Sequence, residues 1–83
     1  MMVQVTLLVA DWCPVCPGAK ELWRSLKNEH GFHYDEVDVA SPFGEKLVSE
    51  LNILSVPTTI IDGRVAFVGV PDRNEAIRKV TKR

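Results

Sequence analysis

Residues 3–26 read VQVTLLVADWCPVCPGAKELWRSL, and this stretch joins an apolar segment to an amphipathic one through two cysteines. Val3–Ala10 is almost continuously apolar, as a strand buried on both faces of a sheet would be. After the cysteines, apolar residues recur at helical spacing at Ala19, Leu22, Trp23 and Leu26. We expect Gly31 to end this helix in the left-handed conformation.

A second strand and a second helix are predicted next. The strand covers Phe32–Asp38 and should lie towards the sheet edge, because polar residues alternate with its apolar ones. Ser41 as N-cap and Pro42 at the first helical position should begin the helix. Asn52 should begin its exit. The predicted apolar face of this helix consists of Phe43, Leu47, Val48 and Leu51.

A β-hairpin and a last helix complete the chain. Pro57–Ile61 and Arg64–Val68 are β-prone, and the Asp62-Gly63 pair between them suits a two-residue type I′ turn. Asp72 and Glu75 form a capping-box pattern for the last helix. The predicted buried side of that helix consists of Ala76, Ile77 and Val80.

The resulting order is βαβαββα, an α/β fold with a four-stranded mixed sheet and three flanking helices. The right-handed crossover rule makes the first two strands neighbours or near neighbours. The length of 83 residues allows one domain, 1–83, and no separate cofactor-binding fold.

Composition excludes two classes of partner. A net charge of −1 leaves no excess of positive charge to displace counterions from nucleic acid. The longest apolar run, Val5–Ala10, is far shorter than a membrane span. The start of the chain lacks the basic region of a secretory signal, so we expect a cytoplasmic protein. We also expect a monomer.

The two cysteines, Cys13 and Cys16, are too close together to act as an effective structural staple. A loop of about four residues is worth roughly 2 kcal/mol in the chain-entropy estimate, against about 4.7 for a hundred-residue loop. Redox or metal chemistry explains such a pair better in a cytoplasmic chain.

Redox chemistry suits the position of the pair at the start of a helix. Unpaired N–H groups there stabilise a thiolate on Cys13, and the thiolate is the form that attacks a disulfide. Cys16, one turn away, could then attack the mixed disulfide and release the reduced substrate. Pro14 suits the first turn because it has no N–H to leave unpaired.

A zinc site formed with His30 and His33 is the metal alternative. The two intervening residues fall short of the usual three to five, and a helix of that length separates the histidines from the thiols by about 20 Å. We therefore expect solvated histidines and no metal ion.

Three motifs resemble those of the thioredoxin and glutaredoxin superfamily, and the resemblance covers essentially the whole chain. They are Ala10-Asp11-Trp12-Cys13-Pro14-Val15-Cys16, Ser55-Val56-Pro57-Thr58 and Val68-Gly69-Val70. The resemblance implies a thioredoxin-like fold. It also implies a cis Pro57 beside the cysteines, a Val56 backbone that pairs with an extended substrate, and room for that substrate at Gly69. Trp12, Pro14, Val15 and Val56 would form a flat docking surface, whereas Trp23 is expected in the core.

The resemblance further implies a protein disulfide reductase, active in electron transport and cell redox homeostasis. Its partners would be protein disulfides and an electron donor, either a disulfide reductase or glutathione. No cofactor beyond the redox-active Cys13–Cys16 pair is expected.

The chain departs from family patterns at several positions. Leu7 replaces the buried Asp of many thioredoxins, and Pro17 replaces their Lys, for which Lys20 is a possible substitute. The Cys-Pro-x-Cys motif is typical of glutaredoxins, but their Gly-Gly pair is absent. Glutathione-dependent activity and a redox-inert docking module therefore stay open as alternatives.

Overall fold

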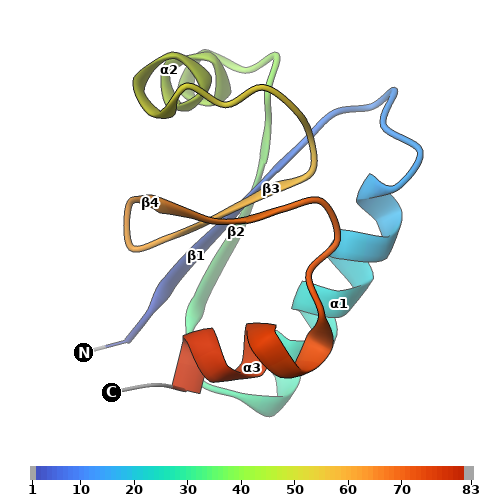
Figure 1. Cartoon of the computed structure of the whole chain (residues 1–83), viewed down its shortest axis with the longest axis vertical. Coiled ribbons are helices and arrows are strands. Elements are labelled where there is room, and N and C mark those ends of the chain that lie inside the picture. Colours follow the sequence, from blue (N-terminus) through green and yellow to red (C-terminus); the bar gives the residue numbers. More distant parts are fainter. Residues whose placement is uncertain (1, 82–83) are drawn as a thin grey trace.

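A computed structural model describes residues 2–81, and its elements follow the predicted order (Figure 1). Their bounds are β1 Gln4–Val9, α1 Cys16–Glu29, β2 His33–Asp38, α2 Pro42–Leu51, β3 Thr58–Ile61, β4 Arg64–Val68 and α3 Arg73–Thr81.

The four strands form one mixed sheet in the order β2-β1-β3-β4. β1 pairs with β2 in parallel and with β3 in antiparallel orientation, and β4 completes the hairpin with β3. The predicted adjacency of the first two strands and the edge position of β2 are both confirmed. α2 lies on one face of the sheet, and α1 and α3 lie on the other (Figure 1).

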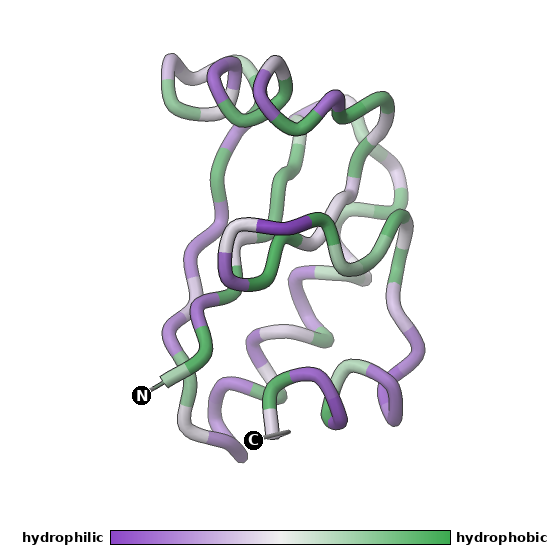
Figure 2. The backbone as a smooth tube through the Cα atoms, turned by 60° about the vertical axis from the view of Figure 1, so that its left-hand side comes forward, coloured by the Kyte–Doolittle hydropathy of each residue, from purple (hydrophilic) through white to green (hydrophobic). Residues whose placement is uncertain are grey.

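Trp23 is the centre of the core between the sheet and the α1 and α3 layer. Its side chain is fully buried, and its ring meets Phe32 edge to face at 5.9 Å between centroids. The indole Nε1–H donates to Thr59 Oγ1 at 3.1 Å, so its polar atom is paired as burial demands. Figure 2 shows hydrophobic and hydrophilic residues alternating along the helices, as expected of helices that have one face on the sheet.

The predicted starts of α2 and α3, the exit of α2 and the hairpin turn are confirmed. Ser41 Oγ accepts from the Gly44 amide at 3.0 Å, and Asn52 leaves α2 in the left-handed conformation. Asp62 and Gly63 both have positive φ angles, 51° and 84°, as a type I′ turn requires. The Asp72 carboxylate accepts from the backbone N–H three residues later, at 3.1 Å, at the start of α3.

Two predictions about the helices are wrong. Gly31 is not left-handed, because the chain already leaves α1 in an extended conformation at His30. Phe43 is not part of the buried face of α2, since its exposed fraction is 55%. In the first turn of α2, Gly44 is the residue that lies against the end of β2. Phe43 precedes it, and successive residues of a helix point about 100° apart, so Phe43 points away from the sheet.

Gly44 has no space for a side chain. A Cβ there would collide with the Asp38 carbonyl group and lie 2.9 Å from Val39 Cα. Because backbone atoms cannot swing aside, we expect Gly44→Ala to lower the free energy of unfolding by about 1–3 kcal/mol, measured by urea denaturation. Gly18→Ala is the matched control, because its Cβ would meet only Val70 Cγ2, at 4.0 Å. That control should gain up to about 1 kcal/mol, and equal midpoints for the two variants would contradict the packing argument.

Candidate active site

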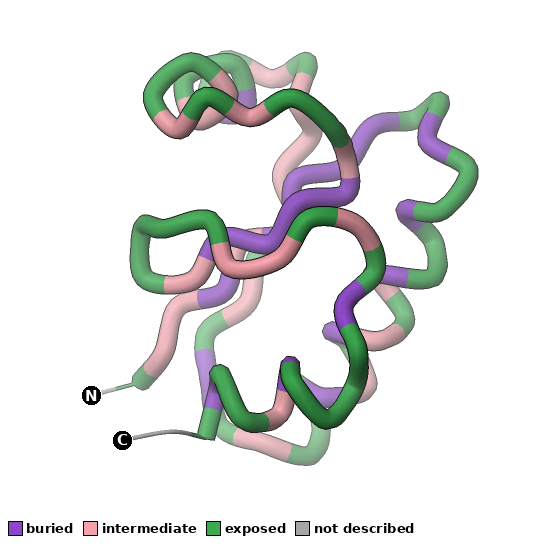
Figure 3. Tube along the Cα trace, in the orientation of Figure 1, coloured by how far each residue is buried: buried purple, intermediate pink, exposed green. Residues whose placement is uncertain are grey.

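Cys13 and Cys16 form a disulfide between the end of β1 and the start of α1, with 5.5 Å between their Cα atoms. Cys13 is 6% exposed and Cys16 is 1% exposed, so the first cysteine is the more accessible of the two. Pro14 and Val15 between them are exposed, and buried and exposed residues alternate along this loop in Figure 3. Any partner that reaches the disulfide therefore meets Cys13 first.

The first amide of α1 points at the Cys13 sulfur. Cys16 N donates to Cys13 Sγ at 3.1 Å, in the place where a capping side chain usually accepts. A helix N-terminus favours negative charge, so this contact stabilises a thiolate on Cys13 when the disulfide is open. The placement of Pro14 in the first helical turn is wrong, because α1 begins only at Cys16 and Pro17 occupies that turn. The two intervening residues form the turn that brings the sulfurs together.

The sheet register brings Pro57 and Gly69 to the same end of the sheet as the cysteines. Leu8 at the end of β1 pairs with Thr58, which in turn pairs with Val68. The Gly69 amide then donates to the Pro57 carbonyl at 2.8 Å. The predicted cis peptide bond before Pro57 is confirmed.

Gly69 has a backbone conformation that favours glycine, and the space beside it is open. Its φ is +87°, in the left-handed region that other residues rarely adopt. A Cβ built there would have nothing within 4 Å, so the space above this residue is open. Open space therefore lies beside Pro57.

Part of the apolar surface at Trp12 forms a shallow hollow. Trp12 is 75% exposed and shares a cavity of about 180 Å³ with Val56, which packs against the core. Pro14 and Val15 are exposed and lie outside the residues that line this cavity. The residues that line it with Trp12 are Val39, Val48, Ile53, Leu54, Ser55 and Val56.

Leu54 is a surface residue that the sequence-based reasoning missed. Its exposed fraction is 98%, and it stands in the loop between α2 and β3. The only signal in the sequence is an apolar pair, Ile53-Leu54, between two polar residues. Such a pair is equally compatible with a buried loop, because periodicity does not extend beyond the helix.

Leu7, which stands where many thioredoxins have a buried Asp, lies in the protein interior. Leu7 is fully buried, and its β2 neighbour in the register is Glu36, a residue that the sequence-based reasoning did not single out. Arg24 donates to both Glu36 carboxylate oxygens, at 2.7 and 2.6 Å, and this pairing holds the pKa of that carboxyl below its usual value. Burial, together with its hydrogen bond to Glu36, raises the pKa of the Tyr34 hydroxyl. This network ties α1 to β2 and keeps the carboxylate ionised.

The histidines lie at the opposite end of α1 from the cysteines. His30 follows the last residue of this 14-residue helix and His33 begins β2, so about 20 Å separates them from the sulfurs. Within residues 2–81, no group of three or more potential ligands is placed to hold a metal ion. In the same part of the chain, no helix combines the length and the apolar character needed to span a membrane.

Comparison with known proteins agrees with this geometry. Residues 1–82 match the thioredoxin domain family. A probable thioredoxin of Methanothermobacter thermautotrophicus is 30% identical over 80 residues, which cover 96% of this chain and 94% of the relative. The thioredoxin of Methanocaldococcus jannaschii is 28% identical over 81 residues, 98% of this chain and 95% of the relative.

A solved structure shows the same fold. Thioredoxin-2 of a malaria parasite superposes with a TM-score of 0.82 at 22% sequence identity, over 99% of this chain and 84% of that one. The relatives are thioredoxins, so the similarity favours thioredoxin over the glutaredoxin alternative. With a family match over almost its whole length and a disulfide at the N-terminus of α1, this chain belongs to the thioredoxin domain family.

Proposed function

We propose that Cys13 of this thiol–disulfide oxidoreductase attacks a protein disulfide and that Cys16 then releases the reduced product. The observation that carries the assignment of roles is the hydrogen bond from the Cys16 amide to Cys13 Sγ. It favours the thiolate on Cys13, and the greater accessibility of this cysteine points the same way.

The reaction passes two electrons from the dithiol to the substrate. The Cys13 thiolate forms a bond to one substrate sulfur, and the other substrate sulfur leaves as a thiolate that takes up a proton. Cys16 then loses its proton and attacks Cys13 Sγ as a thiolate. The bond between Cys13 and the substrate breaks, and the substrate sulfur that was bonded to Cys13 leaves as the second thiolate. The product is the Cys13–Cys16 disulfide, which is the state that the structure holds.

The proposed substrate-binding residues surround the disulfide. An extended substrate segment would pair with the Val56 backbone beside cis Pro57 and pass over the open space at Gly69. Trp12, with Pro14 and Val15, would supply apolar contact, since all three are exposed. The support for these roles is their common position at the end of the sheet where the sulfurs lie.

The proposal includes the partners and the compartment. Protein disulfides are the substrates, and a disulfide reductase or glutathione restores the dithiol. The site uses no cofactor beyond the cysteine pair, and the protein acts as a cytoplasmic monomer in electron transport that maintains cell redox homeostasis. A reducing compartment keeps such a dithiol available for the next cycle.

Trapping of mixed disulfides tests whether Cys13 attacks the substrate and Cys16 releases it. In Cys16→Ser the resolving thiol is gone, so substrate proteins should stay attached to Cys13 as mixed disulfides that dithiothreitol releases. The matched control is Cys13→Ser with Cys16 intact, in which adducts should be few because this thiol is buried. More adducts on the control than on Cys16→Ser would reverse the assigned roles. Partners held by both variants and resistant to dithiothreitol would instead indicate a redox-inert docking module.

A further inference from the structure

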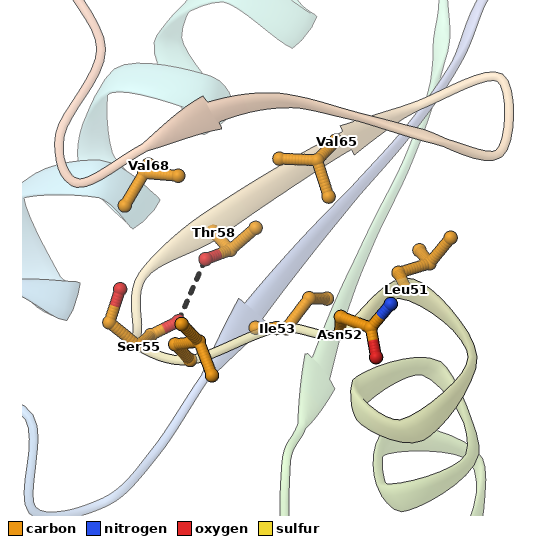
Figure 4. Close-up of a pocket in the computed structure, with 8 residues that line it drawn as sticks. Leu51, Asn52, Ile53, Ser55, Thr58, Val65 and Val68 are labelled. Atoms are coloured by element: carbon orange, nitrogen blue, oxygen red, sulfur yellow. Dashed lines mark hydrogen bonds between the residues drawn. The ribbon is translucent and has the colours of Figure 1, made fainter.

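A second cavity, of about 410 Å³, lies between the loop that follows α2 and the β3–β4 hairpin (Figure 4). We call it the hairpin trough. One wall is formed by the loop that leaves α2, and the other wall is formed by β3 and β4. The lining residues are Leu51, Asn52, Ile53, Leu54, Ser55, Thr58, Val65 and Val68.

The hairpin trough is joined to the site by three residues. Ile53, Leu54 and Ser55 line both this trough and the smaller cavity that contains Trp12. At its near end, Thr58 follows cis Pro57 and Val68 precedes Gly69. A chain that passes over Pro57 and Gly69 therefore reaches the trough without leaving the surface.

The chemistry of the trough favours apolar side chains. None of its lining residues is charged, and its valines remain exposed, Val65 at 43% and Val68 at 69%. The buried Thr58 hydroxyl already donates to the Ser55 carbonyl at 2.7 Å, as the dashed line in Figure 4 shows. Within residues 2–81, every buried side-chain nitrogen or oxygen atom already has a hydrogen-bond partner. The trough therefore offers no buried polar group that a polar ligand would be needed to pair.

We propose that the hairpin trough binds apolar side chains of the extended substrate segment that flanks the reacting cysteine. This inference rests on the proposed function and specifies its substrate class, disulfides that adjoin apolar sequence. The occupant follows from continuity, because the trough and the cavity beside Trp12 share lining residues, so a partner whose disulfide reaches Cys13 would lie next to the trough. Leu54, almost fully exposed, is then a specificity-determining residue.

The length of the trough defines which substrate positions should matter. Val68 and Val65 are three strand residues apart, which corresponds to about 10 Å. An extended chain covers this distance in about three residues. The apolar side chains should therefore occupy about three consecutive residues beyond the part of the substrate that covers Pro57 and Gly69, whereas a substrate that ends sooner would not reach the trough.

Oxidation of the reduced protein by peptide disulfides tests the inference. Two symmetric peptide disulfides are compared, with leucine and valine or with serine and asparagine at three to five residues on both sides of the cysteine. Second-order rate constants are measured by acid quench and thiol alkylation. We expect the apolar peptide to react about tenfold faster, as burial of one additional apolar side chain would produce.

The variants place this preference in the trough. Leu54→Ser and Val65→Thr should each remove most of the preference, and both side chains are exposed enough to be changed without opening the core. Phe43→Ser is the matched control, because Phe43 is an exposed apolar residue, at 55%, that does not line the trough. Bis(2-hydroxyethyl) disulfide, which is too short to reach the trough, should react equally with all four proteins.

Three results would overturn the inference. Equal rates for the two peptides would show that the trough makes no contact with the substrate. A loss in Leu54→Ser that extends equally to bis(2-hydroxyethyl) disulfide would place the effect at the cysteines. A dimer in sedimentation that Leu54→Ser abolishes, with no peptide preference, would make a second copy of the chain the occupant. Failure of the small disulfide to oxidise the wild-type protein through Cys13 would instead refute the proposed function.

Discussion

Replacing Cys13 with serine should lower the rate of insulin disulfide reduction by at least about a thousandfold, with dithiothreitol as the electron donor. The serine hydroxyl is not ionised near neutral pH, whereas the thiolate is the nucleophile of disulfide exchange. The hydrogen bond from the Cys16 amide can stabilise a thiolate but cannot make an alcohol nucleophilic towards sulfur. No other cysteine can replace Cys13 at the more accessible position, because Cys16 is only 1% exposed.

The interpretation of this loss depends on an intact fold. Cys13 is part of the hydrophobic core cluster, so the urea midpoint of Cys13→Ser should be measured together with its activity. Cys13→Ala provides the matched variant, because it removes the sulfur without placing a hydroxyl in apolar surroundings. A folded Cys13→Ser or Cys13→Ala protein that retains wild-type activity would refute the proposed mechanism.

Replacing Trp23 with alanine should have the largest effect on stability, a loss of about 3–5 kcal/mol in the free energy of unfolding. Its indole is fully buried against the rings of Phe32, Tyr34 and Phe67. Its N–H is paired with Thr59. Since small domains have total stabilities of only about 5 kcal/mol or slightly more, the variant should be largely unfolded at moderate urea concentrations. Circular dichroism during urea titration measures this shift.

Trp23→Phe separates the packing from the hydrogen bond. Phenylalanine keeps an aromatic ring in the core but removes the donor to Thr59 Oγ1, so its loss should be clearly smaller than that of alanine. Thr59→Val, which leaves the indole N–H without its partner, should cost about 1–3 kcal/mol. A wild-type urea midpoint for Trp23→Ala would show that this core cluster does not carry the stability of the fold.

Much of the candidate site could be predicted because its signals are local. The spacing of Cys13 and Cys16 after an apolar strand identifies the redox pair, since two intervening residues bring the sulfurs within bonding reach at a helix start. The cis peptide bond before Pro57 followed from the motif resemblance, because X–Pro bonds are the ones that commonly adopt this isomer. Pairing by the hairpin then positions Gly69 beside it.

The predictions that were wrong concern the orientation of a side chain and the exact ends of a helix, which the local sequence pattern does not specify. Phe43 fits the helical spacing of an apolar face, but the close approach of Gly44 to the Asp38 carbonyl group turns it to solvent. Gly31 fits a helix terminator, but the extended conformation at His30 ends α1 one residue earlier. Pro14 fits a first helical turn, but the helix begins only at Cys16. Local spacing allows more than one conformation at each of these residues, and at Phe43 the close approach of Gly44 to the Asp38 carbonyl group selects one.

The sequence by itself determined the order of strands and helices and the chemistry of the cysteine pair, because hydrophobic periodicity and residue spacing act over a few residues. Only the tertiary structure decided that Leu54 is exposed and that it stands between two connected cavities. Exposure depends on which distant segments cover a side chain, and here α2 leaves β3 and β4 partly open on its face of the sheet. The surface that would select substrates is therefore a property of packing, whereas the reaction is a property of the motif.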